Sequence, residues 1–202
     1  MSRDLNSVHP SNELRDLVVS WIVLSLCFAI PYIRHLHFHG VLASFLAVGT
    51  GFATHELAHR TVARRMGLLA RYQAWWGGLL LAFMVAIIST IAFRSTIVFA
   101  APGAVVVYTP WSGIYAVHAT YLVSLAGPLT NVGIAFVSWV VSRLAPPIIS
   151  YYAYITAYVN AVLALFNSLP IPPLDGYKVI RYSVVHWLLL FILSLTLFIV
   201  VR

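Results

Sequence analysis

The feature that most constrains this chain is its set of long apolar runs that carry few charges. Such runs of about 20 residues are long enough to cross the hydrocarbon core of a bilayer as helices. Only 8% of the 202 residues are charged and 61% are hydrophobic, so the chain lacks the side chains to cover a soluble surface. We therefore predict an all-α polytopic membrane protein, a single membrane-embedded domain over residues 1–202. Its predicted spans are 17–33, 40–66, 119–142, 148–169 and 184–201.

The second of these segments contains the sequence His55-Glu56-Leu57-Ala58-His59, while residues 40–54 before it carry no charge. On a helix, residues four apart lie on one face, which places the two imidazoles side by side. Two histidines in this spacing can bind one Zn²⁺, and the glutamate between them can act as a general base. The pattern indicates a hydrolytic metal site inside a membrane span.

A catalytic zinc site usually has three protein ligands, so this pair needs a third. The chain has five acidic residues, and Asp4, Glu13 and Asp16 precede the first span. Glu56 is better placed as the base, which leaves Asp175, between a proline-rich stretch and the next predicted helix. Taken alone, Asp175 could be a turn residue or a helix N-cap. A carboxylate within a membrane protein is costly unless it is paired or metal-bound, and this favours Asp175 as the third ligand.

Three motifs in this order resemble the site-2 protease family of intramembrane zinc metalloproteases, in a minimal form without PDZ or CBS domains. The first is the His55–His59 segment. The second is Gly-Pro-Leu-Thr-Asn at 127–131, preceded by an alanine. The third is Asn-Ser-Leu-Pro-Ile-Pro-Pro-Leu-Asp-Gly at 167–176.

The resemblance implies that His55, His59 and Asp175 bind zinc and that Glu56 is the catalytic base. It places Asn167 near the scissile carbonyl, although a polar cap at a helix end is an equally simple role for this residue. It also implies an intramembrane zinc endopeptidase that cleaves within or near transmembrane segments, in regulated intramembrane proteolysis. The expected partners are transmembrane protein substrates and the lipid bilayer. From their spacing of four, Gly127 and Asn131 are predicted to serve close helix packing.

The segment 77–108 is patterned differently from the predicted spans. Residues 77–93 are apolar but few, and residues 95–108 are rich in β-branched side chains and interrupted by Pro102-Gly103. This predicts two short strands around a turn. We predict a re-entrant, strand-like insertion near the active site, because a segment that returns to its starting side lets 148–169 end beside the two histidines.

The distribution of basic residues supports the same topology. With a re-entrant insertion, only Arg34, Arg143 and Arg202 lie on the far side of the membrane, and the remaining basic residues lie on the side of Arg60. Basic residues concentrate on the cytoplasmic side of membrane proteins. We therefore predict a cell-membrane protein with a cytoplasmic N-terminus and an active site nearer the cytoplasmic face.

A non-catalytic metal-binding membrane protein, such as a metal transporter or sensor, is the alternative function. The alternating His35, His37 and His39 could supply a further metal site, although such residues are more often interfacial polar groups. A transporter is expected to show repeated halves or several charges within the membrane, and the sequence shows neither. The basic residues flank the apolar segments instead of forming a patch, so no nucleic-acid partner is expected.

Overall fold

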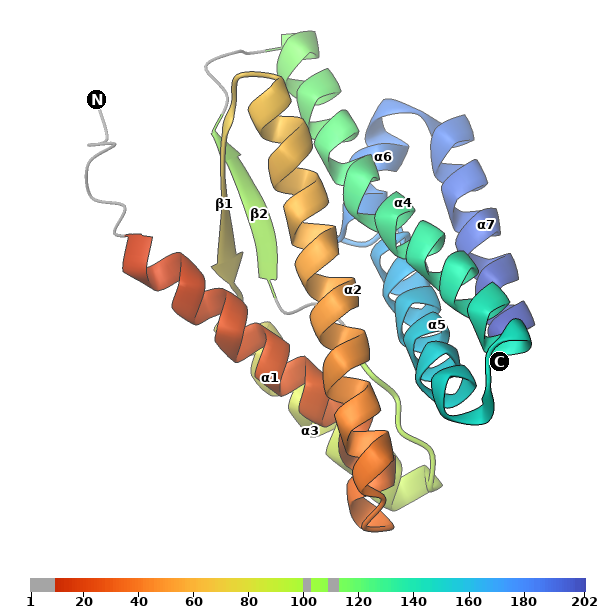
Figure 1. Ribbon diagram of the computed structural model, residues 1–202. Helices are drawn as coiled ribbons and strands as arrows, with labels where there is room; N and C mark the ends of the chain where they lie inside the picture. Colours follow the sequence, from red (N-terminus) through yellow and green to blue (C-terminus); the bar gives the residue numbers. More distant parts are fainter. Residues whose placement is uncertain (1–9, 100–102, 109–112) are drawn as a thin grey trace.

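The computed structural model describes residues 10–99, 103–108 and 113–202 (Figure 1). In this part of the chain six helices are long and apolar enough to cross a membrane, which confirms the predicted helical membrane architecture. The elements, in chain order, are α1 (Pro10–Arg34), α2 (Phe38–Arg65), β1 (Leu69–Ala74), α3 (Trp76–Phe93), β2 (Gly103–Tyr108), α4 (Gly113–Leu144), α5 (Pro147–Asn167), α6 (Asp175–Tyr182) and α7 (Val184–Val201).

Prolines mark the ends of α5 but not the end of α1. Pro147 is the first residue of α5, where its missing N–H costs no hydrogen bond, and the helix ends shortly before Pro170. Pro31 does not end α1, which continues to Arg34. Pro31 lies in the last turn, so only a single hydrogen bond to the preceding turn is lost there.

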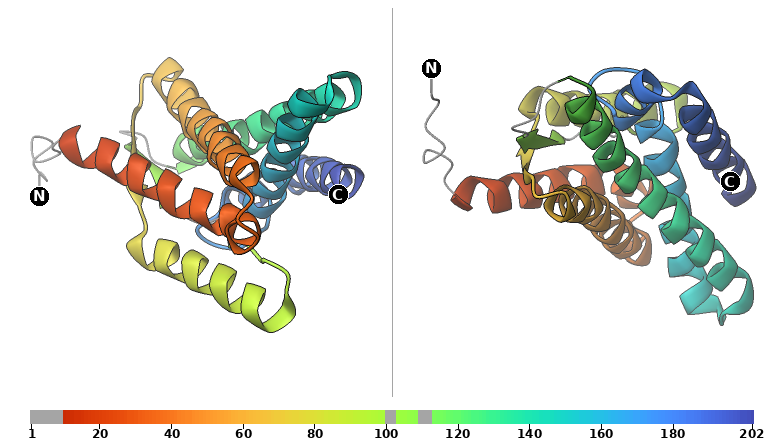
Figure 2. Two further views of the ribbon diagram at one scale, coloured as in Figure 1. Left: turned by 60° about the horizontal axis from the view of Figure 1, so that its bottom comes forward. Right: turned by 90° about the horizontal axis from the view of Figure 1, so that it is seen from above.

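Helices α2, α4 and α5 form the centre of the bundle (Figures 1 and 2). Helix α1 packs on α2, α3 packs on α1, and α7 lies against α5 and α4. Small side chains allow the central helices to approach closely, as is usual between membrane helices. A Cβ at Gly51 on α2 would lie 2.7 Å from Oδ1 of Asn160 on α5. The close approach of these two helices therefore depends on glycine at this position.

The two strands pair antiparallel, but they are not the two strands expected from the sequence. Residue pairing runs from Leu69 opposite Tyr108 to Ala74 opposite Gly103. The hairpin expected within residues 95–108 is wrong: residues 95–99 form no strand, and Pro102 lies outside the described residues. The partner strand precedes α3 in the chain. Local composition signalled β2, but it could not reveal a partner that is brought alongside only when α3 packs on α1.

Carboxylates of α1 close the outer edge of β1. The backbone N–H of Tyr72 donates to Glu13 Oε1, and that of Ala74 donates to Asp16 Oδ2, both at 3.2 Å. Glu13 also forms an ion pair with Arg60 of α2 at 3.4 Å. Unpaired strand edges are normally covered or blocked in native proteins, and here two acidic side chains take the place of a neighbouring strand. The opposite edge of the two-stranded sheet is formed by β2.

The position of α3 places Arg94 at a different end of the bundle from the one that the sequence predicted. Arg94, just beyond α3, lines one pocket together with Arg34 and His35. The prediction that Arg94 lies on the side of Arg60 is therefore wrong, because an 18-residue helix of about 27 Å carries it to the far end of α1. The segment between Ala74 and Gly103 still begins and ends at one level, since these two residues are paired. The single-domain organisation and the membrane topology stay predictions.

Cysteine labelling tests this topology. In a Cys27→Ala background, we expect cysteines at Gly77 and Ser112 to react from one face of sealed vesicles and a cysteine at Ser95 to react from the other. The physical reason is that α3 runs beside α1 to the far end of the bundle, whereas β2 pairs with β1 at the end of the bundle where α3 begins. Labelling of Gly77 and Ser112 from opposite faces would show instead that the insertion crosses the membrane once.

Candidate metal centre

Three buried side chains from two helices meet at one point in the bundle. His55 and His59 lie one turn apart on α2, and Asp175 is the first residue of α6. The two Nε2 atoms are 2.9 Å apart, and Asp175 Oδ2 lies 3.3 Å from Nε2 of His55 and 3.0 Å from Nε2 of His59. Among the described residues, this is the group of acidic, histidine or cysteine side chains whose geometry can hold a metal ion. The structure thus brings together the three predicted ligands.

This geometry fits a zinc ion. Zinc is bound tetrahedrally by imidazole nitrogens and carboxylate oxygens at about 2.0–2.2 Å, which places neighbouring ligand atoms about 3.3 Å apart. Gly127 of α4 keeps the space in front of the ligand atoms open. A Cβ at this position would lie 2.5 Å from Nε2 of His59 and 2.6 Å from Nε2 of His55. The glycine therefore serves the site itself, beyond the helix packing predicted for it.

Both histidines are oriented by groups on α4. Nδ1 of His59 is 2.6 Å from the carbonyl oxygen of Val123, and Nδ1 of His55 is 3.1 Å from Oδ1 of Asn131. Because a carbonyl oxygen can only accept, Nδ1 of His59 donates and leaves the lone pair of Nε2 for a metal. The same tautomer of His55 follows when Asn131 Oδ1 is the acceptor. Such partners fix the ring orientation of metal-binding histidines.

Local sequence places Asp175 against the histidines. The proline-rich stretch after α5 ends at Leu174, and Asp175 then opens α6 as its first residue, so the alternative role of N-cap belongs to Leu174. Gly176 permits a close contact with the end of α5, since a Cβ there would lie 2.1 Å from the carbonyl oxygen of Ser168. Replacing this glycine would push α6, and with it the carboxylate, away from α2.

The environment of Asp175 favours its ionised form. Oδ1 accepts a hydrogen bond from Lys178 Nζ at 3.1 Å, while Oδ2 faces the two imidazoles. Burial acts to raise the pKa of Asp175, but the neighbouring His59 and Lys178 hold it well below its ordinary value. The carboxylate is therefore ready to bind a cation without first losing a proton.

Glu56 lies beside the cluster and has a free oxygen. Its Oε2 is fully buried and has no hydrogen-bond partner in the described part of the chain. Glu56 lines a cavity of about 30 Å³ together with the three ligands, a space that can hold a water molecule. It also lines an apolar cavity of about 460 Å³ between α1, α2 and the sheet. A buried acceptor next to a water-sized space is suited to take up a proton.

Asn167, the last residue of α5, lines the same small cavity. Its Nδ2 donates to the carbonyl oxygen of Leu163 at 3.0 Å, one turn earlier. The structure thus shows the simple helix-end role and, at the same time, places the amide within reach of the metal cluster.

Sequence reasoning missed one contribution to the site. Asn131 was predicted to pack helices, but its Oδ1 lies against Nδ1 of His55; an asparagine within a predicted membrane span was the available signal. Strand β2 contributes Gly103 and Val105 to the cavity of the cluster, in agreement with the strand-like segment that the sequence predicted near the active site.

The alternating histidines near the start of α2 do not form a metal site. His37 contacts Tyr151, with 3.3 Å between Nδ1 and the hydroxyl oxygen, and His39 contacts Tyr152 at 2.9 Å. Of the groups that the described residues form, only the cluster at α2 and α6 has metal-binding geometry. The interfacial position expected for these histidines stays a prediction.

Comparison with known proteins points to one kind of protein. The chain is 37% identical over 177 residues to "Putative zinc metalloprotease MJ0611" of Methanocaldococcus jannaschii, covering 87% of this chain and 86% of that protein. Proteins with the same description, YwhC of Bacillus subtilis and Rip3 of Mycobacterium tuberculosis, are 36% and 34% identical. Those alignments cover 31% and 70% of this chain, but only 34% and 29% of the relatives. No protein-family profile and no solved structure matches the chain.

The contact between Asn131 and His55 predicts a specific effect on metal affinity. We expect Asn131→Ala to weaken zinc binding about 10–100-fold, because the imidazole loses the partner that fixes its tautomer. Asn131→Asp, which keeps an acceptor in place, should retain most of the affinity. Competition with a chromogenic chelator measures the change.

Asn160 provides the matched control, because it is also fully buried and donates to a carbonyl oxygen of its own helix, α5. Asn160→Ala is expected to reduce stability and to leave zinc affinity unchanged. Equal loss of zinc affinity in the two alanine variants would show that Asn131 only fills space.

Proposed function

The chain belongs to the site-2 protease family of zinc metalloproteases, and from this premise we propose that it is an intramembrane zinc endopeptidase. It hydrolyses peptide bonds within or near transmembrane segments of membrane protein substrates. The observation that carries the proposal is the buried group of His55, His59 and Asp175 with Glu56 beside it, of which the two histidines and the glutamate belong to a helix long enough to span a membrane. A soluble protease would hold such a group in a water-exposed cleft.

In this proposal His55, His59 and Asp175 are the metal ligands. Zinc bound there supplies a Lewis acid that lowers the pKa of a bound water and polarises the substrate carbonyl. Oε2 of Glu56 takes the proton of the attacking water and delivers it to the leaving amine. Asn167 gives up its bond to Leu163 and donates Nδ2 to the oxygen that becomes negative during attack.

The free edge of β2 is proposed to hold the substrate in extended form. One edge of the sheet is closed by the carboxylates of α1, whereas Gly103 and Val105 on the other strand line the cavity of the cluster. Helical amides are shielded by their own hydrogen bonds, so a transmembrane helix must unwind before its carbonyl can be attacked. Pairing with a strand edge replaces those lost hydrogen bonds.

The proposed location is the cell membrane, with the active site nearer the cytoplasm. The histidines His55 and His59 of α2 are followed within two turns by Arg60, Arg64 and Arg65, whereas the first turns of this helix contain no lysine or arginine. Basic residues gather at the cytoplasmic ends of membrane helices. The alternative function as a metal transporter or sensor is less well supported, because His37 and His39 contact Tyr151 and Tyr152.

The central experiment separates metal binding from catalysis. We expect the purified protein to contain about one zinc per chain and to cleave a single-span substrate in a chelator-sensitive manner. Glu56→Gln should keep its zinc and lose at least about 10²–10⁴-fold in turnover, because the general base is gone. Asp175→Ala should lose both zinc and activity. Metal analysis and gel-based cleavage assays measure the two quantities.

Thr50→Ala serves as the control, since Thr50 lies on the exposed face of α2 and bonds only to its own helix. It should retain zinc and activity. Full zinc content in Asp175→Ala would remove that residue from the metal site. Unchanged cleavage in Glu56→Gln would rule out the proposed base.

Asn167 is expected to act on the transition state. Asn167→Ala should keep its zinc and fold but lose about 10²–10³-fold in kcat, the usual effect of removing one oxyanion donor. Substrate KM should change little, because the interaction forms during the reaction. Asn160→Ala on the same helix should lose stability without this fall in kcat. Wild-type turnover in Asn167→Ala would leave the residue with its role as a helix-end cap.

A further inference from the structure

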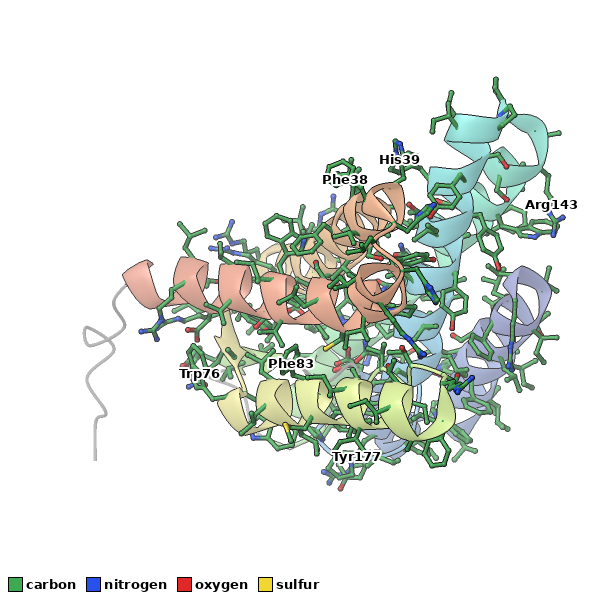
Figure 3. The ribbon with its side chains drawn as sticks, turned by 90° about the horizontal axis from the view of Figure 1, so that it is seen from below. Phe38, His39, Trp76, Phe83, Arg143 and Tyr177 are labelled. Carbon is green, nitrogen blue, oxygen red and sulfur yellow. The ribbon has the colours of Figure 1, made fainter. Side chains whose placement is uncertain are left out.

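A second polar pocket lies at the far end of the bundle from the metal cluster. It is a cavity of about 340 Å³ between the ends of α1 and α3 and the middle of α5, the end of the bundle seen in Figure 3. This volume falls within the range of about 300–1,000 Å³ that is common for ligand pockets. Helix α2 begins near this end at Phe38 and reaches His55 about 26 Å later. The pocket and the metal cluster therefore lie towards opposite faces of the membrane.

The mouth of the pocket carries positive charge without a matching negative charge. Arg34 and Arg94, both exposed, line it together with His35, and no acidic residue does. Within the described residues, the ion pairs formed by arginine and lysine involve other side chains, and neither of these two arginines stacks on an aromatic ring. Guanidinium groups at a membrane boundary that lack an internal partner are available to an external anion.

Two tyrosines also line this pocket. Tyr32 of α1 and Tyr158 of α5 line the same pocket. In the part of the chain that the structure describes, the phenol groups of these two residues form no hydrogen bond. Phosphate oxygens are strong acceptors for guanidinium and hydroxyl donors, and arginine is particularly suited to them because its planar group can donate two parallel hydrogen bonds.

The floor of the pocket is apolar. Phe28, Ile155 and Val159 line it and are 7%, 3% and 1% exposed. The mouth lies at the ends of two candidate membrane spans, Glu13–Arg34 and Trp76–Phe93, and so at the level where headgroups meet hydrocarbon. The cavity thus combines a cationic rim at headgroup depth with a hydrocarbon-like surface that reaches towards the middle of the membrane.

We propose that this pocket binds one anionic phospholipid, with its phosphate between Arg34 and Arg94 and the start of an acyl chain on the apolar floor. Basic pockets between transmembrane helices are suited to lipid headgroups by charge complementarity. The alternative for the two arginines is that they only offset the partial negative charge at the C-terminal ends of α1 and α3. The two explanations differ in whether the protein discriminates among lipids.

Native mass spectrometry of the zinc-loaded protein in a neutral detergent, titrated with dioleoylphosphatidylglycerol, tests the proposal. We expect one lipid to be retained per chain and dioleoylphosphatidylcholine to be retained at least about tenfold more weakly. Arg34→Gln with Arg94→Gln should weaken retention by roughly tenfold or more. Arg34→Lys with Arg94→Lys, which keeps both charges, should retain the lipid within a few-fold of the natural protein.

Arg143→Gln is the matched control, because Arg143 lies at the same end of the bundle and already stacks over Trp139 at 5.8 Å. It should bind phosphatidylglycerol like the natural protein. Zinc content and gel-filtration profile report folding of each variant. Val162→Trp, which fills the apolar floor and leaves the charges intact, should also weaken binding and does not depend on the fate of the arginine variants.

Three results would overturn the proposal. Equal retention of the two lipids would show that charge is not recognised, and undiminished retention in the double glutamine variant would place the lipid elsewhere. Competition by glycerol 3-phosphate at the same concentration as the lipid would identify a site for a soluble phosphate instead of a lipid. None of these measurements depends on cleavage, so the outcome is separate from that of the proposed protease activity.

Discussion

The contact between the Asp175 carboxylate and the two imidazoles of α2 is the interaction on which the rest of the structure depends. Charged groups inside a membrane protein are costly unless opposite charges or a metal compensate them. Here the compensation requires α6 to begin against α2, at the end of α5. Gly176 allows α6 to pack closely against the end of α5, and Gly127 leaves the Nε2 atoms of the two histidines uncovered. The central helices therefore pack around a buried polar cluster, whose burial in an apolar environment would be unfavourable without these contacts.

The two strands of the small sheet have different surroundings. Glu13 and Asp16 accept hydrogen bonds from the outer amides of β1, so α1 and the sheet are held together. Two residues of the other strand, Gly103 and Val105, line the cavity of Glu56 and the metal cluster. The ends of the bundle differ as well: one holds the metal cluster, the other a basic pocket with an apolar floor.

Much of the site could be predicted because its residues are unusual for their surroundings. In a chain with five acidic residues, a glutamate between two histidines and an aspartate after a proline-rich stretch stand out. The helices followed in the same way from uncharged runs of membrane length. The sequence-based predictions were wrong where the structure depends on packing against an element that is distant in the chain. The partner of β2 was expected within the same short segment, and the place of Arg94 was inferred from the predicted re-entrant insertion, while the packing of α3 on α1 determined both.

By itself the sequence indicated the membrane helices, from uncharged runs of sufficient length, and the residues that gather at the candidate metal centre, because acidic residues are few and two histidines stand four apart on one helix. Tertiary structure alone decided that Asn131 orients His55, that β1 pairs with β2, and that Arg34 and Arg94 line one pocket. Each of these brings together residues that are distant in the chain. Spacing along a chain specifies which side chains share a helical face, but only the packing of helices specifies which faces meet.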